Sequence, residues 1–251
     1  MPKTVLIAGK ELPSGSDFAS GASLKGRTSL ITVSPSDKNP VTVNGVKAVT
    51  WNRSSVLSAK SVVLNSLNIG GNIDEAVLLF DEEWYASGYV NADGVADSIR
   101  IVEELITGYQ YLTDELINRF HKKVYKAEDK KTSKLVFIYK PNHTLCDAVT
   151  NASLKLTGAS LSSPYIASAG AAFKAFAENT AASLCESEDV IPVLVNCDPS
   201  NEMSRRDNTL STWLCDYLDA IDSLKRSLTS RQKTSWVKAG AKSPGGFGLF
   251  S

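Results

Sequence analysis

Several short apolar runs in this chain do not alternate polar with apolar residues, and this feature constrains the fold more than any other. The clearest runs are Ala76–Phe80, Leu135–Tyr139 and Ile191–Asn196. A strand of this kind is covered on both faces, which is typical of a parallel sheet. Further strands are predicted at Thr4–Ala8, Ser29–Val33, Val46–Trp51 and Thr234–Lys238. We therefore expect a sheet of about seven strands.

Longer segments between these runs have the periodicity of amphipathic helices. One apolar stripe recurs at three- and four-residue spacing over 109–124, and a stronger one recurs over 210–228. Ser163-Pro164 is typical of a helix N-cap followed by proline in the first turn, so a helix is predicted from Tyr165. Strand and helix alternate over the whole length, which predicts an α/β fold with a doubly wound parallel sheet. We expect one domain over residues 1–251, with a flexible tail at 241–251.

Composition narrows the classes of function. Lys+Arg and Asp+Glu both number 27, so the formal net charge is zero. No basic excess indicates nucleic acid or an anionic membrane as a partner. The apolar runs are too short for a signal peptide or a membrane span, so we expect a cytoplasmic protein. The four cysteines and two histidines are not spaced as metal ligands, so no metal site is predicted.

The turn after the first predicted strand is a candidate phosphate site. In doubly wound folds the first strand leads into a glycine-rich turn and a helix N-terminus, where free N–H groups hold a phosphate. The segment here is Ala8-Gly9-Lys10-Glu11-Leu12-Pro13-Ser14-Gly15. Gly9 and Gly15 suit such a turn, whereas Pro13 removes an N–H donor and Glu11 adds negative charge. The same two glycines also suit a plain strand-to-helix turn.

The segment Ser163–Phe176 resembles the active-site helix of the short-chain dehydrogenase/reductase family. That family carries Tyr-x-x-x-Lys, usually within Tyr-x-Ala-Ser-Lys-Ala-Ala. Tyr165, Ala167 and Ser168 match this pattern, and Ala169 stands at the lysine position. The resemblance covers nearly the whole chain in the order of its elements, and it implies a Rossmann-like fold.

By this resemblance Tyr165 occupies the position of the catalytic acid/base. A phenol has an unperturbed pKa of about 10 and needs a nearby cation to act near neutral pH. Ala169 supplies none. Lys140, just after the fifth predicted strand, is the candidate replacement, and the alternative interpretation is a solvated loop lysine.

Other family positions are also altered. The family's cofactor turn is Thr-Gly-x-x-x-Gly-x-Gly, where Gly9 and Gly15 match but Pro13 replaces the middle glycine. The family's Asn-Asn-Ala-Gly after the fourth strand is replaced by the acidic and aromatic run 81–85. The family's serine after the fifth strand falls on Tyr139-Lys140, and the helix asparagine falls on Leu105.

These departures together favour a non-catalytic member of this fold that acts as a structural or ligand-binding protein. We expect no cofactor, or weak binding of NADP, because Lys10, Ser34 and Lys38 suit a 2′-phosphate better than a free ribose hydroxyl. The alternative hypothesis is an NAD(P)-dependent oxidoreductase with a rearranged site, in which Tyr165 donates the proton and Lys140 is the cation. The sequence does not name a substrate.

The resemblance also implies an assembly. In the family, the helices that correspond to 108–124 and 165–185 pack against their mates in a second subunit. The first has an apolar stripe and the second is rich in small residues, so we expect a homodimer or homotetramer through these two helices.

Overall fold

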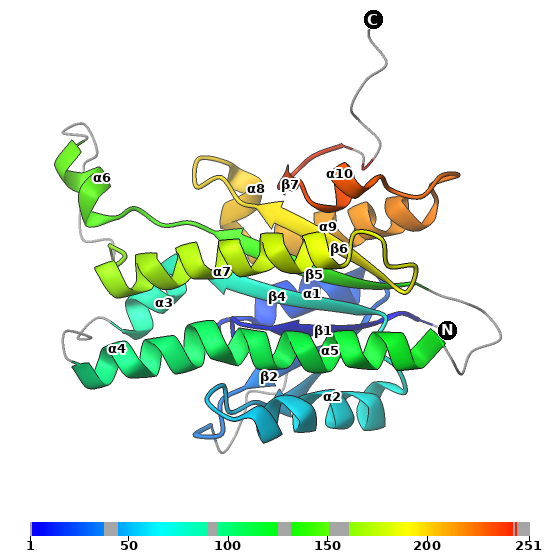
Figure 1. Ribbon diagram of the computed structural model, residues 1–251, viewed down its shortest axis with the longest axis horizontal. Coiled ribbons are helices and arrows are strands. Elements are labelled where there is room, and N and C mark those ends of the chain that lie inside the picture. Colours follow the sequence, from blue (N-terminus) through cyan, green and yellow to red (C-terminus); the bar gives the residue numbers. More distant parts are fainter. Residues whose placement is uncertain are drawn as a thin grey trace, which may run out of the picture.

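The computed structural model describes residues 2–37, 45–89, 95–124, 132–150, 161–242 and 244. Within this part of the chain, seven strands form one sheet in the order β3-β2-β1-β4-β5-β6-β7, and every neighbouring pair is parallel. The predicted doubly wound α/β fold is therefore confirmed (Figure 1). The strands are β1 (Thr4–Ala8), β2 (Thr28–Val33), β3 (Val46–Thr50), β4 (Glu75–Asp81), β5 (Ser133–Lys140), β6 (Val190–Asn196) and β7 (Trp236–Lys238).

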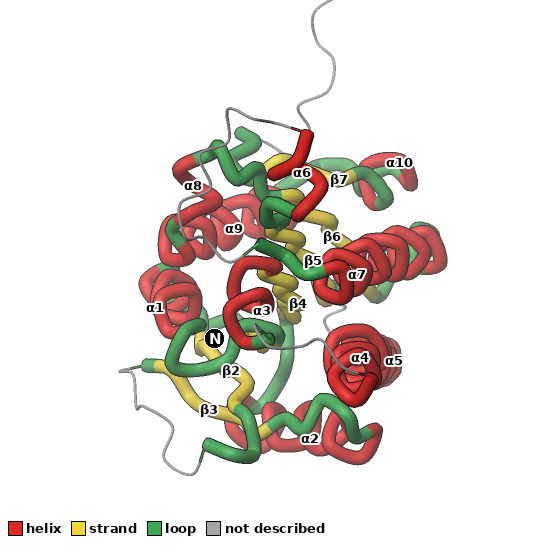
Figure 2. The backbone as a smooth tube through the Cα atoms, turned by 90° about the vertical axis from the view of Figure 1, so that its left-hand side faces the viewer, coloured by secondary structure: helices red, strands yellow, loops and turns green. Residues whose placement is uncertain are grey.

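Helices cover both faces of the sheet (Figure 2). One layer consists of α1 (Ser16–Leu24) and α9 (Asp207–Asp222), and the other of α2 (Val56–Gly70), α5 (Gly108–Val124) and α7 (Pro164–Ser183). Shorter elements complete the described structure: α3 (Glu82–Gly88), α4 (Val95–Ile101), the π-helical η1 (Val102–Thr107), α6 (Leu145–Thr150), α8 (Glu202–Arg205) and α10 (Ser230–Lys233).

The position of the strands between two helical layers explains why polar and apolar residues do not alternate along them. Successive side chains of β4 enter two different cores, because Leu78 packs with α2, α5 and α7 while Val77 packs with α1 and α9. Both cores are apolar, so both faces of the strand need apolar residues. The helical stripes contribute as predicted, with Leu112 in the first core and Leu214 in the second.

Helix boundaries follow local chemistry. The side chain of Ser163 accepts a hydrogen bond from the N–H of Ile166 at 3.3 Å, and Pro164 occupies the first turn, so α7 begins where the sequence predicted an N-cap. The predicted seventh strand is shorter than expected, because Thr234 ends α10 and pairing starts only at Trp236. Most of the predicted tail 241–251 lies outside the described residues.

A buried ion group joins the starts of β2 and β4 to helix α9. The Arg27 guanidinium, just before β2, lies 3.2 Å from both carboxylate oxygens of Glu75 at the start of β4. It also donates to both oxygens of Asp219 on α9 at 2.8 Å. Glu75 is fully buried, so its charge depends on Arg27 and on the more distant ammonium of Lys3 at 3.7 Å.

Arg27→Met should lower the free energy of unfolding by about 3–5 kcal/mol, because it leaves the Glu75 carboxylate buried with little compensation. Lys25→Met is the matched control. Lys25 pairs at 2.8 Å with Asp216, whose side chain is 59% exposed, and should cost at most about 1 kcal/mol. Urea unfolding followed by circular dichroism measures both losses, and equal losses would contradict the role given to Arg27.

Candidate functional site

The strand order fixes where a doubly wound fold would hold a ligand. The chain winds outward in opposite directions from β1 and β4, and the carboxyl ends of these strands border the topological switch point. Figure 2 looks onto this edge, with α3 and α6 in front of the sheet. The residues at this edge are therefore the candidate site.

A buried arginine occupies the switch point. Arg53 follows β3, and its guanidinium donates to the carbonyl oxygen of Gly9, to Tyr85 Oη at 2.5 Å and to Glu11 Oε1 at 2.9 Å. Tyr85 Oη lies 2.6 Å from Tyr109 Oη, which donates to the carbonyl of Leu79 at 2.7 Å. Arg53, its two phenol neighbours and Trp51 form what we call the Arg53 cluster, in which the guanidinium lies 4.8 Å from the Trp51 ring.

The charge in this cluster is retained despite burial. Burial by itself would lower the pKa of Arg53, but the neighbouring Tyr85, Glu11 and Tyr109 outweigh it and hold this pKa well above its ordinary value. Burial raises the pKa of Tyr85 and Tyr109, so both phenols remain protonated donors. The cluster is thus a cation satisfied by a carboxylate, a carbonyl and two aromatic hydroxyls.

Gly9 and Gly15 serve the packing of the chain on itself. A Cβ built at Gly9 would lie 1.9 Å from the carbonyl oxygen of Leu79 and 2.5 Å from Tyr109 Oη, and its φ is +119°. A Cβ at Gly15 would lie 2.3 Å from the carbonyl oxygen of Lys10. The N–H groups of Gly15 and Ser16 bond to carbonyls of the turn itself, those of Glu11 and Pro13, at 2.8 and 3.0 Å. The turn therefore uses internally two of the donors that would otherwise face a phosphate.

Lys10 and Lys140 come together in a closed group of four charges. Each ammonium lies 3.0 Å from Asp81 Oδ2 and 2.7 Å from an oxygen of Asp207. Both carboxylates are buried, and Asp207 is also the first residue of α9, where negative charge is favourable. We call Lys10, Asp81, Lys140 and Asp207 the ion quartet. Burial opposes the shift, but the two lysines lower the pKa of Asp81, and the two aspartates raise that of Lys140.

Glu82 occupies the space beside the active-site helix of the resemblance. Its buried carboxylate accepts from Tyr139 Oη at 2.5 Å, from the N–H of Asn142 at 2.9 Å and from Ser162 Oγ at 3.3 Å. A Cβ built at Gly170 would lie 2.1 Å from Glu82 Oε1, so the glycine leaves room for this carboxylate in its observed position. Burial raises the pKa of Glu82 even though these hydrogen bonds oppose the shift.

The tyrosine of the resemblance lies apart from these groups. Tyr165, in the first turn of α7, is 39% exposed, and the part of the chain described here gives its hydroxyl no hydrogen bond. Ala169, one turn further, is buried in the core. Lys140, the proposed replacement cation, is held in the ion quartet.

Ser34 follows β2, and its hydroxyl lies 2.8 Å from Ser36 Oγ. Lys38, its predicted companion, lies outside the described residues. Beside the turn, a cavity of about 530 Å³ is lined by Lys10, Ser14, Asp17 and residues 205–209. Among the described side chains, no cluster of three or more His, Cys, Asp or Glu could hold a metal ion.

Several residues of this site were not singled out from the sequence. Arg53 comes after the weakest predicted strand and belongs to no motif, so only the topology brings it to Gly9. Asp207 is the first residue of α9 and matches no motif in the sequence. Glu82 could have been suspected, because it belongs to an acidic run that follows a buried strand. The sequence did not show that its side chain points into the protein.

Comparison with solved structures assigns the fold. A 3-ketoacyl-(acyl-carrier-protein) reductase from Brucella melitensis, complexed with NADH, matches with a TM-score of 0.58 and 13% identity over 94% of this chain and 96% of its own. A short chain dehydrogenase from Mycobacterium smegmatis matches with a TM-score of 0.57 and 13% identity over 96% and 92%. A mutant short-chain dehydrogenase/reductase from Serratia marcescens matches with 0.55 and 14% over 95% and 96%.

The chain therefore has the short-chain dehydrogenase/reductase fold, as the resemblance predicted. No protein-family model matches the sequence, and no curated protein matches it either. No helix in the described part of the chain is long and apolar enough to cross a membrane.

Glu82→Gln should change how stability depends on pH. Because folding raises the pKa of Glu82, the folded chain binds this proton more tightly than the unfolded chain. The contribution of Glu82 to stability is then greatest below its ordinary pKa of 4.5 and falls as pH rises through the folded value. The stability of the wild type relative to Glu82→Gln should therefore decline from about pH 4 toward pH 8.

Urea unfolding across this pH range measures the difference. Glu83→Gln is the matched control, because Glu83 is the exposed neighbour of Glu82 in the same helical turn. A relative stability of wild type to Glu82→Gln that rises with pH would contradict the environment described for Glu82.

Proposed function

We propose that this chain is a non-catalytic protein of the short-chain dehydrogenase/reductase fold, which acts in the cytoplasm as a structural or interaction subunit. The observation that carries the proposal is the Arg53 cluster, which fills the switch point with the chain's own side chains. The fold is shared with reductases, but the residues at this edge bind one another.

A dinucleotide fits these residues poorly. In this fold its pyrophosphate would approach the Gly9–Gly15 turn. The guanidinium of Arg53 already bonds the Gly9 carbonyl, and the N–H groups of Gly15 and Ser16 already have partners. The two cations nearest the turn are neutralised, because Arg53 pairs with Glu11 and Lys10 pairs with Asp81 and Asp207. Binding would require breaking buried ion pairs, which is costly.

The residues that would assist Tyr165 as proton donor in a reductase of this fold are replaced or already bonded to other groups. Tyr165 has the buried Ala169 where the resemblance implies a lysine. Lys140 would have to leave two carboxylates at 2.7 and 3.0 Å to reach a substrate. Tyr139 stands at the serine position, and its hydroxyl is committed to Glu82 at 2.5 Å. These contacts support an inactive site over the alternative of a rearranged NAD(P)-dependent oxidoreductase.

The purified chain should show no NADPH fluorescence enhancement and no NADH fluorescence enhancement up to about 1 mM nucleotide, since that range covers cofactor affinities useful to an enzyme. Ala169→Lys should gain no reductase activity, because the rest of the site is closed. Tyr165→Phe is the matched variant for the alternative. Saturable NADPH binding together with turnover that Tyr165→Phe abolishes would establish the oxidoreductase and overturn the proposal.

The same proposal includes assembly through α5 and α7. The two helices lie side by side on one face of the molecule (Figure 1). The outer face of α7 exposes Ala171, Ala175 and Ala182, which leave room for a second helix to approach closely. This geometry supports a homodimer or homotetramer that forms through α5 and α7.

Sedimentation at micromolar concentration should show a dimer or tetramer. Ala175→Arg should produce monomers, because it places a charged, bulky side chain in the middle of the proposed interface, while arginine keeps the helix intact. Asn65→Arg, at an exposed position of α2, is the matched control and should leave the assembly unchanged. A monomeric wild type would remove this part of the proposal.

A further inference from the structure

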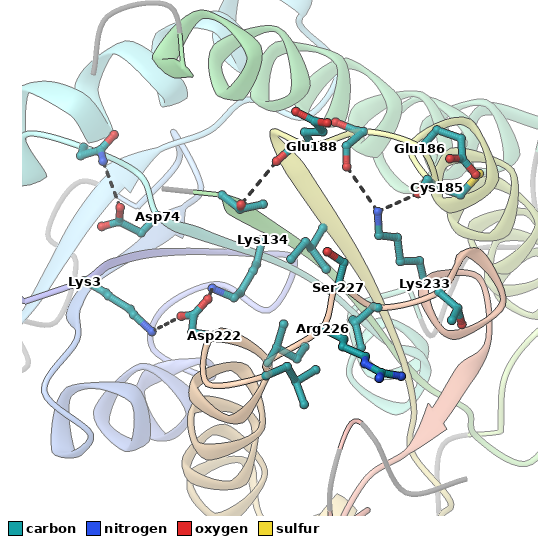
Figure 3. A pocket seen from close by; sticks show the side chains of 18 of the residues that line it. Lys3, Asp74, Lys134, Cys185, Glu186, Glu188, Asp222, Arg226, Ser227 and Lys233 are labelled. Carbon is teal, nitrogen blue, oxygen red and sulfur yellow. Dashed lines mark hydrogen bonds and ion pairs between the residues drawn. The ribbon is translucent and has the colours of Figure 1, made fainter. Parts of the chain in front are cut away.

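A large cavity lies at the opposite end of the sheet from the candidate site. It has a volume of about 1200 Å³ and is bordered by the amino ends of β1, β5 and β6, the ends of α2 and α9, and α10 (Figure 3). A volume of this order is sufficient for a drug-sized molecule, since ligand pockets commonly measure roughly 300–1,000 Å³. The resemblance places no function at this end of the fold.

One wall of the cavity carries a buried ammonium without a carboxylate partner. Lys233, at the end of α10, is 8% exposed, and its Nζ donates to the carbonyl oxygens of Cys185 at 2.7 Å and Ser187 at 3.3 Å. No carboxylate oxygen of the described residues lies within 4.0 Å of this Nζ. An ammonium has three N–H donors, so one remains available beside the cavity.

The carbonyls of Cys185 and Ser187 accept two of the three hydrogen bonds that the Lys233 ammonium can donate, but they do not neutralise its charge. They follow the C-terminus of α7, where a cation interacts favourably with the helix dipole. A buried charge is nevertheless normally matched by an opposite charge or by further hydrogen bonds. Lys233 has neither a carboxylate nor a third acceptor in the part of the chain that the structure describes.

The other charges around the cavity are arranged differently. On the far side, Lys3 and Lys134 both bind Asp222, at 2.7 and 2.5 Å (Figure 3). Asp74 accepts from the N–H of Thr4 at 2.9 Å and therefore faces β1. These groups satisfy one another, whereas Lys233 is a buried cation of the lining with no carboxylate partner among the described residues.

The rim near Lys233 has charges of both signs. Glu186 and Glu188 are exposed, and Glu186 accepts from Ser230 Oγ at 2.9 Å. Lys225 and Arg226 are exposed on the neighbouring loop, and no ion pair is formed by either within the described residues. The rim is therefore close to neutral, so the buried charge of Lys233 decides what the interior favours.

Apolar side chains complete the lining. Ile221 is buried, while Ile191, Leu224 and Leu228 are half-buried, and all four border the cavity. An apolar surface next to one fixed charge is the usual composition of a site for a small organic molecule. From these observations we propose that this cavity binds a small organic anion, with its acid group at Lys233 and its apolar body against these four side chains.

Octanoate and its neutral analogue octanamide are suitable probes, because they share an apolar body and differ in charge. Titration of the ¹⁵N-labelled full chain should give saturable shifts for amides of residues 185–191 and 221–233 with octanoate. Octanamide should bind at least about tenfold more weakly, because it lacks the charge that pairs with the ammonium. Equal affinity for the two probes would overturn the proposal.

Lys233→Met keeps an unbranched side chain, one atom shorter, and removes its charge, so octanoate affinity should fall at least about tenfold. Lys60→Met, exposed on α2, is the matched control and should bind as the wild type does. Unchanged affinity in Lys233→Met would show that Lys233 only caps α7 and would overturn the proposal.

A second variant keeps the test decisive if Lys233→Met does not fold. Ser227 is exposed on the lining loop, so Ser227→Glu should preserve the fold and weaken octanoate severalfold by repulsion. Octanoate binding that is unaffected by this carboxylate, or shifts that map outside the cavity, would contradict the site. The result is independent of nucleotide binding, because the two sites lie at opposite ends of the sheet.

Discussion

The buried guanidinium of Arg53 is the interaction on which the carboxyl edge of the sheet depends. It joins the turn after β1, through Gly9 and Glu11, to α3, through Tyr85. Removing a partner from such a group leaves an uncompensated buried charge, so the surrounding positions are constrained together. Gly108 shows this constraint, since a Cβ there would lie 2.8 Å from the Arg53 carbonyl oxygen at the point where η1 continues into α5.

The altered family positions have a common physical explanation in these contacts. Tyr139, at the Tyr139-Lys140 position of the family serine, donates to the carboxylate of Glu82, which lies against Gly170. Lys10 and Lys140 neutralise Asp81, which is the buried last residue of β4. The departures at 81–82 and at 139–140 therefore supply partners for one another, since Tyr139 bonds Glu82 and Lys140 pairs with Asp81. Such a network favours a closed edge over a cleft that a ligand can enter.

The periodicity of apolar residues in the sequence was sufficient to predict the fold. Unalternating strands and amphipathic helices predicted the doubly wound sheet, because each pattern reports the two faces of a single element. The contacts of the candidate site could not be predicted from the sequence in the same way, because they join residues from separate elements. The acidic run 81–83 is uniform in sequence, yet Asp81 is in the ion quartet and Glu82 points inward, while Glu83 alone of the three is exposed. No local pattern distinguishes these three directions.

The two ends of the sheet differ in how their buried charges are satisfied. At the carboxyl end, each charged member of the Arg53 cluster and the ion quartet has a partner of opposite charge within the chain. At the amino end, Lys134 is matched by Asp222, but Lys233 is held by carbonyls alone beside a large cavity. A charge that the chain does not neutralise favours a ligand of opposite sign, whereas a satisfied network opposes one. The two ends of this sheet therefore differ in electrostatics, and the buried cation without a carboxylate partner lies at the end opposite to the switch point of the doubly wound fold.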